Sequence, residues 1–572
     1  MFTVDELLNE YYPHVAKHSL LNKPLRFVLR HLLHEREIAD FGQAYPHYHD
    51  IDFVEQVLEY FNVSTSVRDT ERERIPDSGR VVIIANHPIG SIDGLALIKL
   101  ISEIRHDLKV VANQMLMAIE PLRDMLLPVN NMQGGTPKQH LSAIHDHLAA
   151  DGAVLIFPAG EVSRLRPQGV RDTQWHSGFL RIARHTKSPV LPIFIDAKNS
   201  PLFYSVSMVY KPLATALLVT EMFKQRRKSL PMRIGELIPF SSFQSLSMSL
   251  PEQVKLFKRH LYRVGTNRKG IFTTQAAIAM PEDRKELSRA MRNCEHLGET
   301  ADGKHIYLYL HQGSSVIMRE IGRLREIAFR AVGEGTLQRR DIDKYDSHYY
   351  HLILWDATDL EIVGAYRFGD ARLLSKPDHP TGLYSATLFD YADHNPALFE
   401  KGLELGRSFV QPRYWGKRSL DYLWIGIGAF LNRYPDYQYL FGPVSLSNSY
   451  PQPAKQLIVQ FYATYFPARF GQASARVPFH VTADNLTTFS GDDYKKEFTR
   501  LKHLLANMGV NVPTLYKQYS EVCEPDGVAF LDFNIDPDFC DCVDGLVVVD
   551  SAKLLPKKRK RYILSHQIAK IA

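Results

Sequence analysis

A histidine and an aspartate with five residues between them follow a short apolar run in the first third of the chain. The run VVIIA (81–85) leads into Asn86-His87-Pro88, and Asp93 opens the segment DGLALIKL. An imidazole that an acidic partner holds in one tautomer can take the proton from a hydroxyl that attacks a thioester. The spacing therefore predicts general-base chemistry, with His87 as the base and Asp93 as the group that orients it.

A second polar loop, FPAGEVSR (157–164), follows another apolar run. It contains Glu161 and Arg164, and both loops come directly after strand-like segments. Ligands of α/β sheets bind at the carboxyl ends of buried strands, so we expect Glu161 and Arg164 to contact the acceptor. Arg164 is suited to pairing with a carboxylate, and an ordinary surface ion pair is the alternative.

Together, ANHPIGSIDG and FPAGEVSR resemble the first and third blocks of the lysophospholipid acyltransferase family, and PVLPIFI (189–195) resembles the block that lines the acyl route. The family has four residues between His and Asp, and its second loop reads FPEGTRS. Here Ala159 replaces Glu, Glu161 replaces Thr and Val162 replaces Arg. The family's basic loop helps to hold a glycerol phosphate, so these changes predict an acceptor with little negative charge or with an ammonium group.

The second half of the chain carries a set of charged residues in a characteristic order: Arg325 and Phe329 in LREIAFR, Asp343 and Asp346 in DIDKYD, Arg367 in GAYRF, and Glu404 and Arg407 in LELGRS. In this order, over about 310–450, they resemble the GNAT branch that contains acyl-homoserine-lactone synthases and ornithine N-acyltransferases. The resemblance implies an electronegative pocket for an amino-acid acceptor, formed by Asp343, Asp346 and Glu404.

An amino-acid acceptor must reach a thioester as a neutral amine, although free ornithine carries two ammonium groups and a carboxylate. Acidic side chains can hold one ammonium while a carboxylate, directly or through water, takes the proton from the attacking nitrogen. We expect Glu404 to be this base, and Arg367 and Arg407 to bind the acceptor carboxylate or to brace the acidic cluster. A solvated Glu404–Arg407 pair on a helix is the alternative.

The segment QPRYWGKRSL follows Val410 and supplies Arg413, Gly416 and Lys417 just before a helix-like stretch. The resemblance to GNAT enzymes implies that this loop binds the phosphate of the acyl donor, as helix N-termini do. Its glycine pattern is thinner than a full nucleotide-binding loop. We therefore expect acyl-carrier protein, rather than free coenzyme A, as the donor.

Short runs rich in β-branched residues alternate with helix-like segments in the first half, at 81–85, 108–112, 153–158 and 189–195. This alternation predicts βαβ crossovers and a sheet buried on both faces, hence an α/β fold. We expect an N-terminal helical segment at 1–75 and an O-acyltransferase domain at 76–261, with 233–240 as its last strand.

A linker is expected at 262–285, followed by a GNAT-type α/β domain at 286–572. In the second domain the patterns predict helices at 315–329, at 403–409 and from Ser419, and strands at 351–356, 361–368 and 439–444.

The net charge of +6 describes a mildly basic surface, which suits anionic lipid or an acidic carrier and is too weak to indicate nucleic acid. No apolar stretch reaches the roughly 20 residues that span a bilayer, the N-terminus lacks a signal-peptide pattern, and the four cysteines lack metal-binding spacing. We expect a cytoplasmic enzyme without metal or cofactor, bound peripherally to the inner face of the cytoplasmic membrane. An apolar stripe either contributes to that contact or packs on the domain's own core; it consists of Leu25, Val28, Leu29, Leu32 and Leu33.

Over nearly all of 80–550 the chain resembles the bifunctional ornithine lipid synthases. The resemblance implies that the C-terminal domain transfers a 3-hydroxyacyl group to the α-amine of ornithine, and that the N-terminal domain then acylates the 3-hydroxyl of lyso-ornithine lipid. Both acyl groups come from acyl-carrier protein. Three alternatives stay open: a synthase for another amino acid (glycine, lysine or glutamine), a lysophosphatidate acyltransferase with a regulatory GNAT half, and a non-catalytic lipid- or carrier-binding protein.

Overall fold

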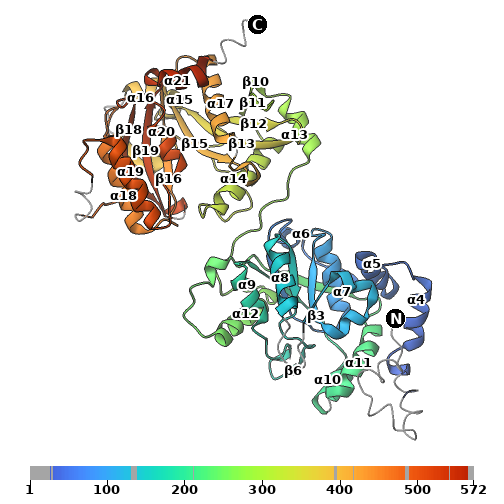
Figure 1. The fold of residues 1–572 in the computed structure, drawn as a ribbon. Coiled ribbons are helices and arrows are strands. Elements are labelled where there is room, and N and C mark those ends of the chain that lie inside the picture. Colours follow the sequence, from blue (N-terminus) through green and yellow to red (C-terminus); the bar gives the residue numbers. More distant parts are fainter. Residues whose placement is uncertain are drawn as a thin grey trace. The chain divides into compact units, whose positions relative to one another are not determined.

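The computed structural model of the chain describes residues 26, 30–129, 138–209, 211–391, 396–416, 418–482, 489–539 and 541–564. The chain divides into two compact units, Met1–Ala279 and Met280–Ala572. Each unit contains its own central sheet with helices packed against it (Figure 1). The α/β fold predicted for both halves is confirmed.

The sheet of the first unit has seven strands in the order β1-β9-β8-β2-β5-β3-β4. Their bounds are β1 (Ser64–Ser66), β9 (Ser229–Ile234), β8 (Val190–Ile195), β2 (Val81–Ala85), β5 (Ala153–Ile156), β3 (Lys109–Asn113) and β4 (Leu126–Val129). The central strands β8, β2, β5 and β3 are parallel. The four apolar runs therefore form the strands that their pattern predicted.

The described part of the segment 1–75, which was expected to be helical, forms helices at Glu35–Ala44, Asp50–Phe61 and Asp69–Arg72. It also contributes the short edge strand β1, which pairs with β9. One expectation for this unit is wrong. The last strand was expected at 233–240, whereas β9 spans Ser229–Ile234 and runs antiparallel to β8. The regular ladder ends where Pro192 of β8 has no N–H to donate.

Helices cover both faces of the first sheet. Alternate residues of β2 point to opposite faces, so Ile83 packs with α5 (Asp50–Phe61) and α7 (Ser91–Ser102). Ile84 packs on the other face, with α8 (Lys138–Ala149), α9 (Gly178–His185) and α12 (Leu250–Gly265). The remaining elements are α4 (Glu35–Ala44), α6 (Asp69–Arg72), β6 (Arg164–Arg166), β7 (Gly169–Arg171), α10 (Pro201–Val209) and α11 (Lys211–Phe223). Of the N-terminal apolar stripe, Leu25, Val28 and Leu29 lie outside the described residues.

The second unit has an eight-stranded sheet, in which only β15 and β16 pair in parallel. In order across the sheet its strands are β10 (Glu295–Glu299), β11 (His305–Leu310), β12 (Tyr350–Asp356), β13 (Glu361–Asp370), β15 (Gly402–Val410), β16 (Tyr439–Leu446), β19 (Cys542–Asp550) and β18 (Val528–Asp536). Helices α13 (Arg284–Met291) and α14 (Val316–Ala331) pack on one face. The other face carries α17 (Ser419–Arg433), α18 (Gln452–Tyr465), α19 (Tyr494–Asn507) and α20 (Thr514–Ser520). The smaller elements are α15 (Ala371–Leu374), β14 (Phe389–Tyr391), α16 (Pro396–Lys401), β17 (Ala473–Ala475) and α21 (Pro556–Arg559).

The prediction of a helix at 403–409 is wrong, because this segment is strand β15. It lies in the middle of the sheet, between β13 and β16. Leu403 and Leu405 are buried in its core, so strand pairing on both sides outweighs the helix-like spacing of its apolar residues. The other helices and strands predicted for this unit are confirmed to within two residues at their starts.

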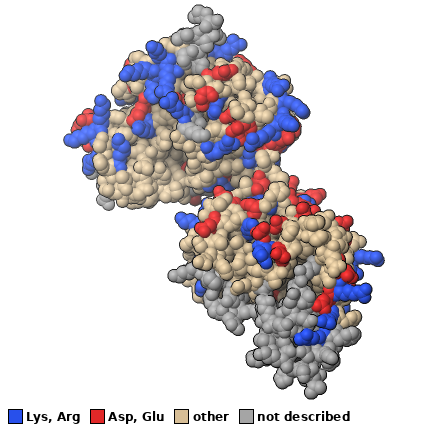
Figure 2. Space-filling view, turned by 45° about the vertical axis from the view of Figure 1, so that its right-hand side comes forward, with Lys and Arg blue, Asp and Glu red and all other residues tan. Residues whose placement is uncertain are grey.

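No described helix is long and apolar enough to cross a bilayer. On the face shown in Figure 2, basic and acidic side chains are interspersed on both units.

Candidate active sites

The loop that carries His87 is fixed to the neighbouring strand by the side chain of Asn86. The Asn86 amide donates to the Ile195 carbonyl at 2.9 Å and accepts from the Ile195 N–H at 2.8 Å. Because β2 and β8 are parallel, this pair of bonds holds the loop at the carboxyl edge of the sheet. The position of the imidazole is thereby set by the sheet.

His87 and Asp93 lie together despite the longer loop between them. Nδ1 of His87 is 3.1 Å from Oδ1 of Asp93, and the aspartate is fully buried. The other carboxylate oxygen accepts the N–H groups of Ile89 and Gly90 at the start of α7. Burial alone would lower the pKa of His87, but the charge and hydrogen bond of Asp93 and the charge of Asp172 together outweigh it, so the pKa lies above its ordinary value.

Asp172, which the sequence reasoning did not identify, supports this pair from a distant loop. Its carboxylate accepts the His87 backbone N–H at 3.2 Å, the Ser163 hydroxyl at 2.5 Å and the Trp175 indole N–H at 2.8 Å. Burial raises the pKa of Asp172, while these donors oppose the rise. No motif marks Asp172, since its partners are brought to it only by the fold.

Glu161 and Arg164 contact each other, with the closest nitrogen and oxygen 3.5 Å apart. Arg164 is buried, donates to the Ser207 hydroxyl at 2.6 Å and stacks over the Phe203 ring. Neither residue lines the cavity that His87 faces.

That cavity has a volume of about 410 Å³ and is mainly apolar. His87 and Phe157 lie at its wall, with their ring centroids 4.5 Å apart. Val162, at the position where the family has Arg, also lines it. Among the described residues that line the cavity there is no Lys or Arg.

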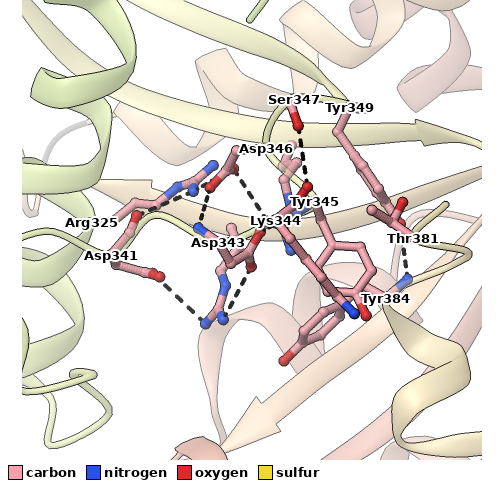
Figure 3. Close-up of polar contacts among 12 residues, drawn as sticks. Arg325, Asp341, Asp343, Lys344, Tyr345, Asp346, Ser347, Tyr349, Thr381 and Tyr384 are labelled. Carbon is pink, nitrogen blue, oxygen red and sulfur yellow. Dashed lines mark hydrogen bonds and ion pairs between the residues drawn. The ribbon is translucent and has the colours of Figure 1, made fainter. Parts of the chain in front are cut away.

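In the second unit, three aspartates (Asp341, Asp343 and Asp346) and three arginines (Arg325, Arg367 and Arg407) form one network of ion pairs. Figure 3 shows Arg325 beside the three aspartates. Arg325 and Arg367 both contact Oδ1 of Asp346, at 2.8 and 3.2 Å. Arg367 also pairs with Asp343 at 2.7 Å. Burial alone would raise the pKa of Asp346, but the two guanidinium groups hold it well below its ordinary value.

Arg407 completes this network through longer contacts. Its nitrogens lie 3.8 Å from Asp341 and 3.7 Å from Asp343, and its guanidinium packs over the rings of Tyr384 and Phe539. Its Nε has no hydrogen-bond partner among the described residues. The Nε atoms of Arg325 and Arg367 also lack a partner there, so Arg407 differs from these two arginines in the greater length of its ion pairs.

Glu404 lies on β15 and is 1% exposed. Its carboxylate accepts the backbone N–H groups of Ser385 at 2.6 Å and Tyr384 at 3.1 Å, and also the Tyr349 hydroxyl. It does not line the neighbouring cavity, whereas Tyr384 does. Glu404 therefore anchors the loop that carries Tyr384.

The cavity lies where β15 and β16 separate. The two strands pair only from Gly402 to Glu404, and a Cβ on Gly442 would lie 2.0 Å from the Leu405 carbonyl oxygen. Beyond this close approach β15 has a bulge opposite β13, and Arg407 adopts a left-handed φ of 51°. The result is a wedge-shaped opening with a volume of about 100 Å³.

Two carboxyl groups that the sequence reasoning missed, Glu334 and Asp544, line this opening together with Arg407. Burial and repulsion by Asp544 raise the pKa of Glu334 to about 7, and burial raises the pKa of Asp544 to about 7. Glu334 follows α14, and Asp544 lies on β19. Because these elements are far apart in the sequence, only the tertiary structure brings the two residues together.

The expected donor loop precedes α17. Arg413 pairs with Asp359 and Glu361, each at 2.6 Å. Gly416 has a left-handed φ of 74° and open space around its Cα, while Lys417 lies outside the described residues.

Two protein families match the chain in the order of its two units. The family described as "Acyltransferase" matches residues 6–268, and the family described as "Acetyltransferase (GNAT) domain" matches residues 324–425.

The individual relatives are N-acyltransferases and O-acyltransferases. The glycine N(alpha)-acyltransferase of Bacteroides thetaiotaomicron is 32% identical over 303 residues, covering 50% of this chain and 89% of the relative. The lyso-glycine lipid O-acyltransferase of Phocaeicola vulgatus is 27% identical over 228 residues, covering 38% and 81%. The L-ornithine N(alpha)-acyltransferase of Brucella abortus is 29% identical over 175 residues, covering 25% and 60%.

Proposed function

This chain belongs to the acyltransferases of amino-acid lipid synthesis and joins an acyltransferase domain to a GNAT domain, and from that premise we propose that it builds a diacylated ornithine lipid in two steps. The second unit forms an amide between a 3-hydroxyacyl group and the α-amine of ornithine. The first unit then esterifies the 3-hydroxyl of the lyso-ornithine lipid. Acyl-carrier protein delivers both acyl groups as thioesters.

The ester-forming step uses His87 as the base and Asp93 as the positioning group. His87 takes the proton of the 3-hydroxyl while that oxygen attacks the thioester carbonyl. The carbon–sulfur bond breaks, the ester forms, and the proton leaves with the carrier thiol. Asp93 stabilises the imidazolium that exists in between.

The observation that carries this assignment is the absence of Lys and Arg among the described residues that line the His87 cavity. A glycerol-phosphate acceptor brings a doubly charged group that needs cationic partners. Val162 lines the wall instead, and Arg164 is already engaged with Ser207 and Glu161. An apolar lyso lipid with a small zwitterionic head suits such a cavity better than lysophosphatidate.

The amide-forming step is proposed for the opening between β15 and β16. Arg407 lines this opening and contacts its aspartates only at 3.7 and 3.8 Å, so it is suited to bind the carboxylate of the amino acid. Asp343 contacts Arg407 and also pairs with Arg367, which in turn pairs with Asp346. This chain of ion pairs holds Arg407 in place. We assign Glu404 a positioning role, because its carboxylate already accepts three hydrogen bonds.

Two further parts of the proposal concern the surface. Arg413, Gly416 and Lys417 would bind the phosphopantetheine of the carrier. Helix α10 exposes Leu202, Met208 and Val209, with 58%, 67% and 88% of their surfaces accessible. These apolar side chains support the proposed peripheral contact with a membrane, which we place at the anionic inner face of the cytoplasmic membrane.

Glycine is the second candidate for the amino acid. The glycine N(alpha)-acyltransferase aligns over 89% of its length with this chain, whereas the ornithine enzyme of Brucella abortus aligns over 60%. Both acceptors would use the same two steps, so one experiment separates them.

The test is lipid extraction and mass spectrometry from a host without amino-acid lipids that expresses wild type, His87→Ala or Glu404→Ala. Diacylated ornithine lipid is expected from wild type, the monoacyl lyso form from His87→Ala, and neither lipid from Glu404→Ala. If wild type makes diacylated glycine lipid instead, the amino-acid substrate is glycine and not ornithine. No new amino lipid from folded wild type, together with activity on lysophosphatidate, would overturn the proposal.

A further inference from the structure

The opening between β15 and β16 contains carboxyl groups from two elements that are far apart in sequence. Glu334 lies on the loop after α14, and Asp544 lies on β19. Asp544 is 2% exposed and accepts a hydrogen bond from Ser445, with the Cys542 thiol 3.8 Å away. Glu334 is half-buried, and no described residue donates to its carboxylate or forms an ion pair with it.

The loop that holds Glu334 is rigidly built. Glu326 is fully buried in α14, and its carboxylate accepts the Thr336 N–H at 3.0 Å, the Thr336 hydroxyl at 2.7 Å and the Leu337 N–H at 2.9 Å. The Glu334 N–H itself donates to the Phe329 carbonyl at 2.8 Å. The loop is thus fixed on both sides of Glu334, while the carboxylate remains free.

Glu334 and Glu404 therefore differ in what their oxygens can do. The carboxylate oxygens of Glu404 already accept three hydrogen bonds, and Glu404 does not line the opening. Glu334 lines the opening together with Arg407, whose Nε is unpaired among the described residues. An acceptor amino acid held there by its carboxylate on Arg407 would place its ammonium among the acidic groups of the same small cavity.

We propose that Glu334 is the base that takes a proton from the acceptor ammonium in the amide-forming step, and that Asp544 tunes it; this rests on the proposed N-acyltransferase function. The carboxylate accepts one ammonium proton, and the neutral amine attacks the thioester carbonyl. The carbon–nitrogen bond forms as the carbon–sulfur bond breaks. One of the two amine protons passes to the departing thiolate, so that the carrier leaves as its thiol and the amide keeps one N–H; Glu334 returns its proton to water.

The charged and titratable groups that face Glu334 or share its cavity are Asp544, Cys542, Arg407, Tyr366, Tyr384, Tyr450 and Tyr519, with Asp536 next to Asp544. Burial raises the pKa of the Cys542 thiol and of each of these tyrosines above its ordinary value, so they stay neutral near pH 7. Only Glu334 and Asp544 have a pKa of about 7. Below that pH Glu334 is protonated and cannot act as a base, so the rate should rise with pH through 7.

The experiment measures thiol release from a 3-hydroxyacyl thioester of acyl-carrier protein by the full-length chain, with L-ornithine or glycine as acceptor, from pH 5.5 to 9. Glu334→Gln should lower kcat by about 100-fold on the alkaline plateau, and the deficit should shrink towards low pH, where Glu334 of wild type is itself protonated. Asp544→Asn removes the neighbouring negative charge, so the acid limb of the profile should move to lower pH while the plateau is largely kept. The control Glu299→Gln alters an exposed carboxylate on β10 and should match wild type.

Thermal unfolding of each variant shows whether it is folded. A folded Glu334→Gln protein with kcat within threefold of wild type overturns the assignment. An acid limb that stays in place in Asp544→Asn overturns the tuning role. If wild type releases no thiol with either amino acid, the N-acyltransferase function itself fails, whatever the variants do.

Discussion

At His87 the balance between burial and the charge of Asp93 decides when the imidazole can accept a proton. Burial lowers the pKa of His87, and the Asp93 carboxylate 3.1 Å away, together with the charge of Asp172, raises it above its ordinary value. The base must be neutral to work, so ester formation should increase as pH rises through this raised pKa. Asp93 therefore orients the base, but by raising the pKa of His87 it also lowers the activity at low pH.

Asp93→Asn tests this balance. Without the negative charge, burial lowers the pKa of His87, so the acid limb of ester formation should move to lower pH. The plateau rate should fall by about 100-fold or more, because the imidazolium loses its partner. The measurement is the pH profile of lyso-lipid acylation by the full-length protein.

Amide formation by the same Asp93→Asn protein serves as the control and should be unchanged, because Asp93 belongs to the first unit. A pH profile that coincides with that of wild type would contradict the role given to Asp93.

Among the elements, β15 carries most of the second site. One side of the strand presents Glu404 to the Tyr384 loop, and its bulge turns Arg407 toward the opening. The opening exists because β15 and β16 pair over only three residues before they separate. Gly442 is required at that point of separation, since any side chain there meets the Leu405 carbonyl.

Gly442→Ala should therefore damage the site through the strands. The added methyl would lie 2.0 Å from the Leu405 oxygen, and relieving that clash pushes the strands apart. We expect a loss of about 1–3 kcal/mol in the free energy of unfolding and strongly reduced amide formation. Denaturant unfolding and thiol-release rates measure the two effects.

Gly178→Ala is the matched control, because nothing lies within 4 Å of the methyl that it adds. It should leave stability and both activities near those of wild type. Equal stability of Gly442→Ala and wild type would show that the separation of the strands tolerates a side chain.

At the scale of the whole molecule, the two chemistries belong to two units that each have their own sheet and core. The described His–Asp site and the described β15–β16 opening are each formed entirely within one unit. Separate chains of residues 1–279 and 280–572 should therefore each fold and keep one activity.

The two separate chains can be tested with defined substrates. Residues 280–572 should make the lyso lipid from an amino acid and a 3-hydroxyacyl thioester, and residues 1–279 should convert supplied lyso lipid to the diacyl form. Mass spectrometry of the products reads out both. A first chain that is folded but inactive until the second is added would contradict the independence of the sites.

The sequence by itself determined the features that are encoded locally. Runs of β-branched residues marked the strands β2, β3, β5 and β8, and the loop after β2 carried His87 and Asp93 within a few residues of each other. Periodicity and short spacings reflect local geometry, so they could be interpreted without a structure. The order of the motifs also indicated two acyltransferase domains.

Only the tertiary structure decided what depends on contacts between distant segments. The segment at 403–409 looked helical and became β15 because strands pair on both of its sides. Glu404 was expected in the site and is held away from the opening by Tyr349, Tyr384 and Ser385. Asp172, Glu334 and Asp544 gain their positions and altered pKa values from burial beside residues far away in the chain. Burial and long-range pairing are properties of the folded sheet, and no local pattern in the sequence encodes them.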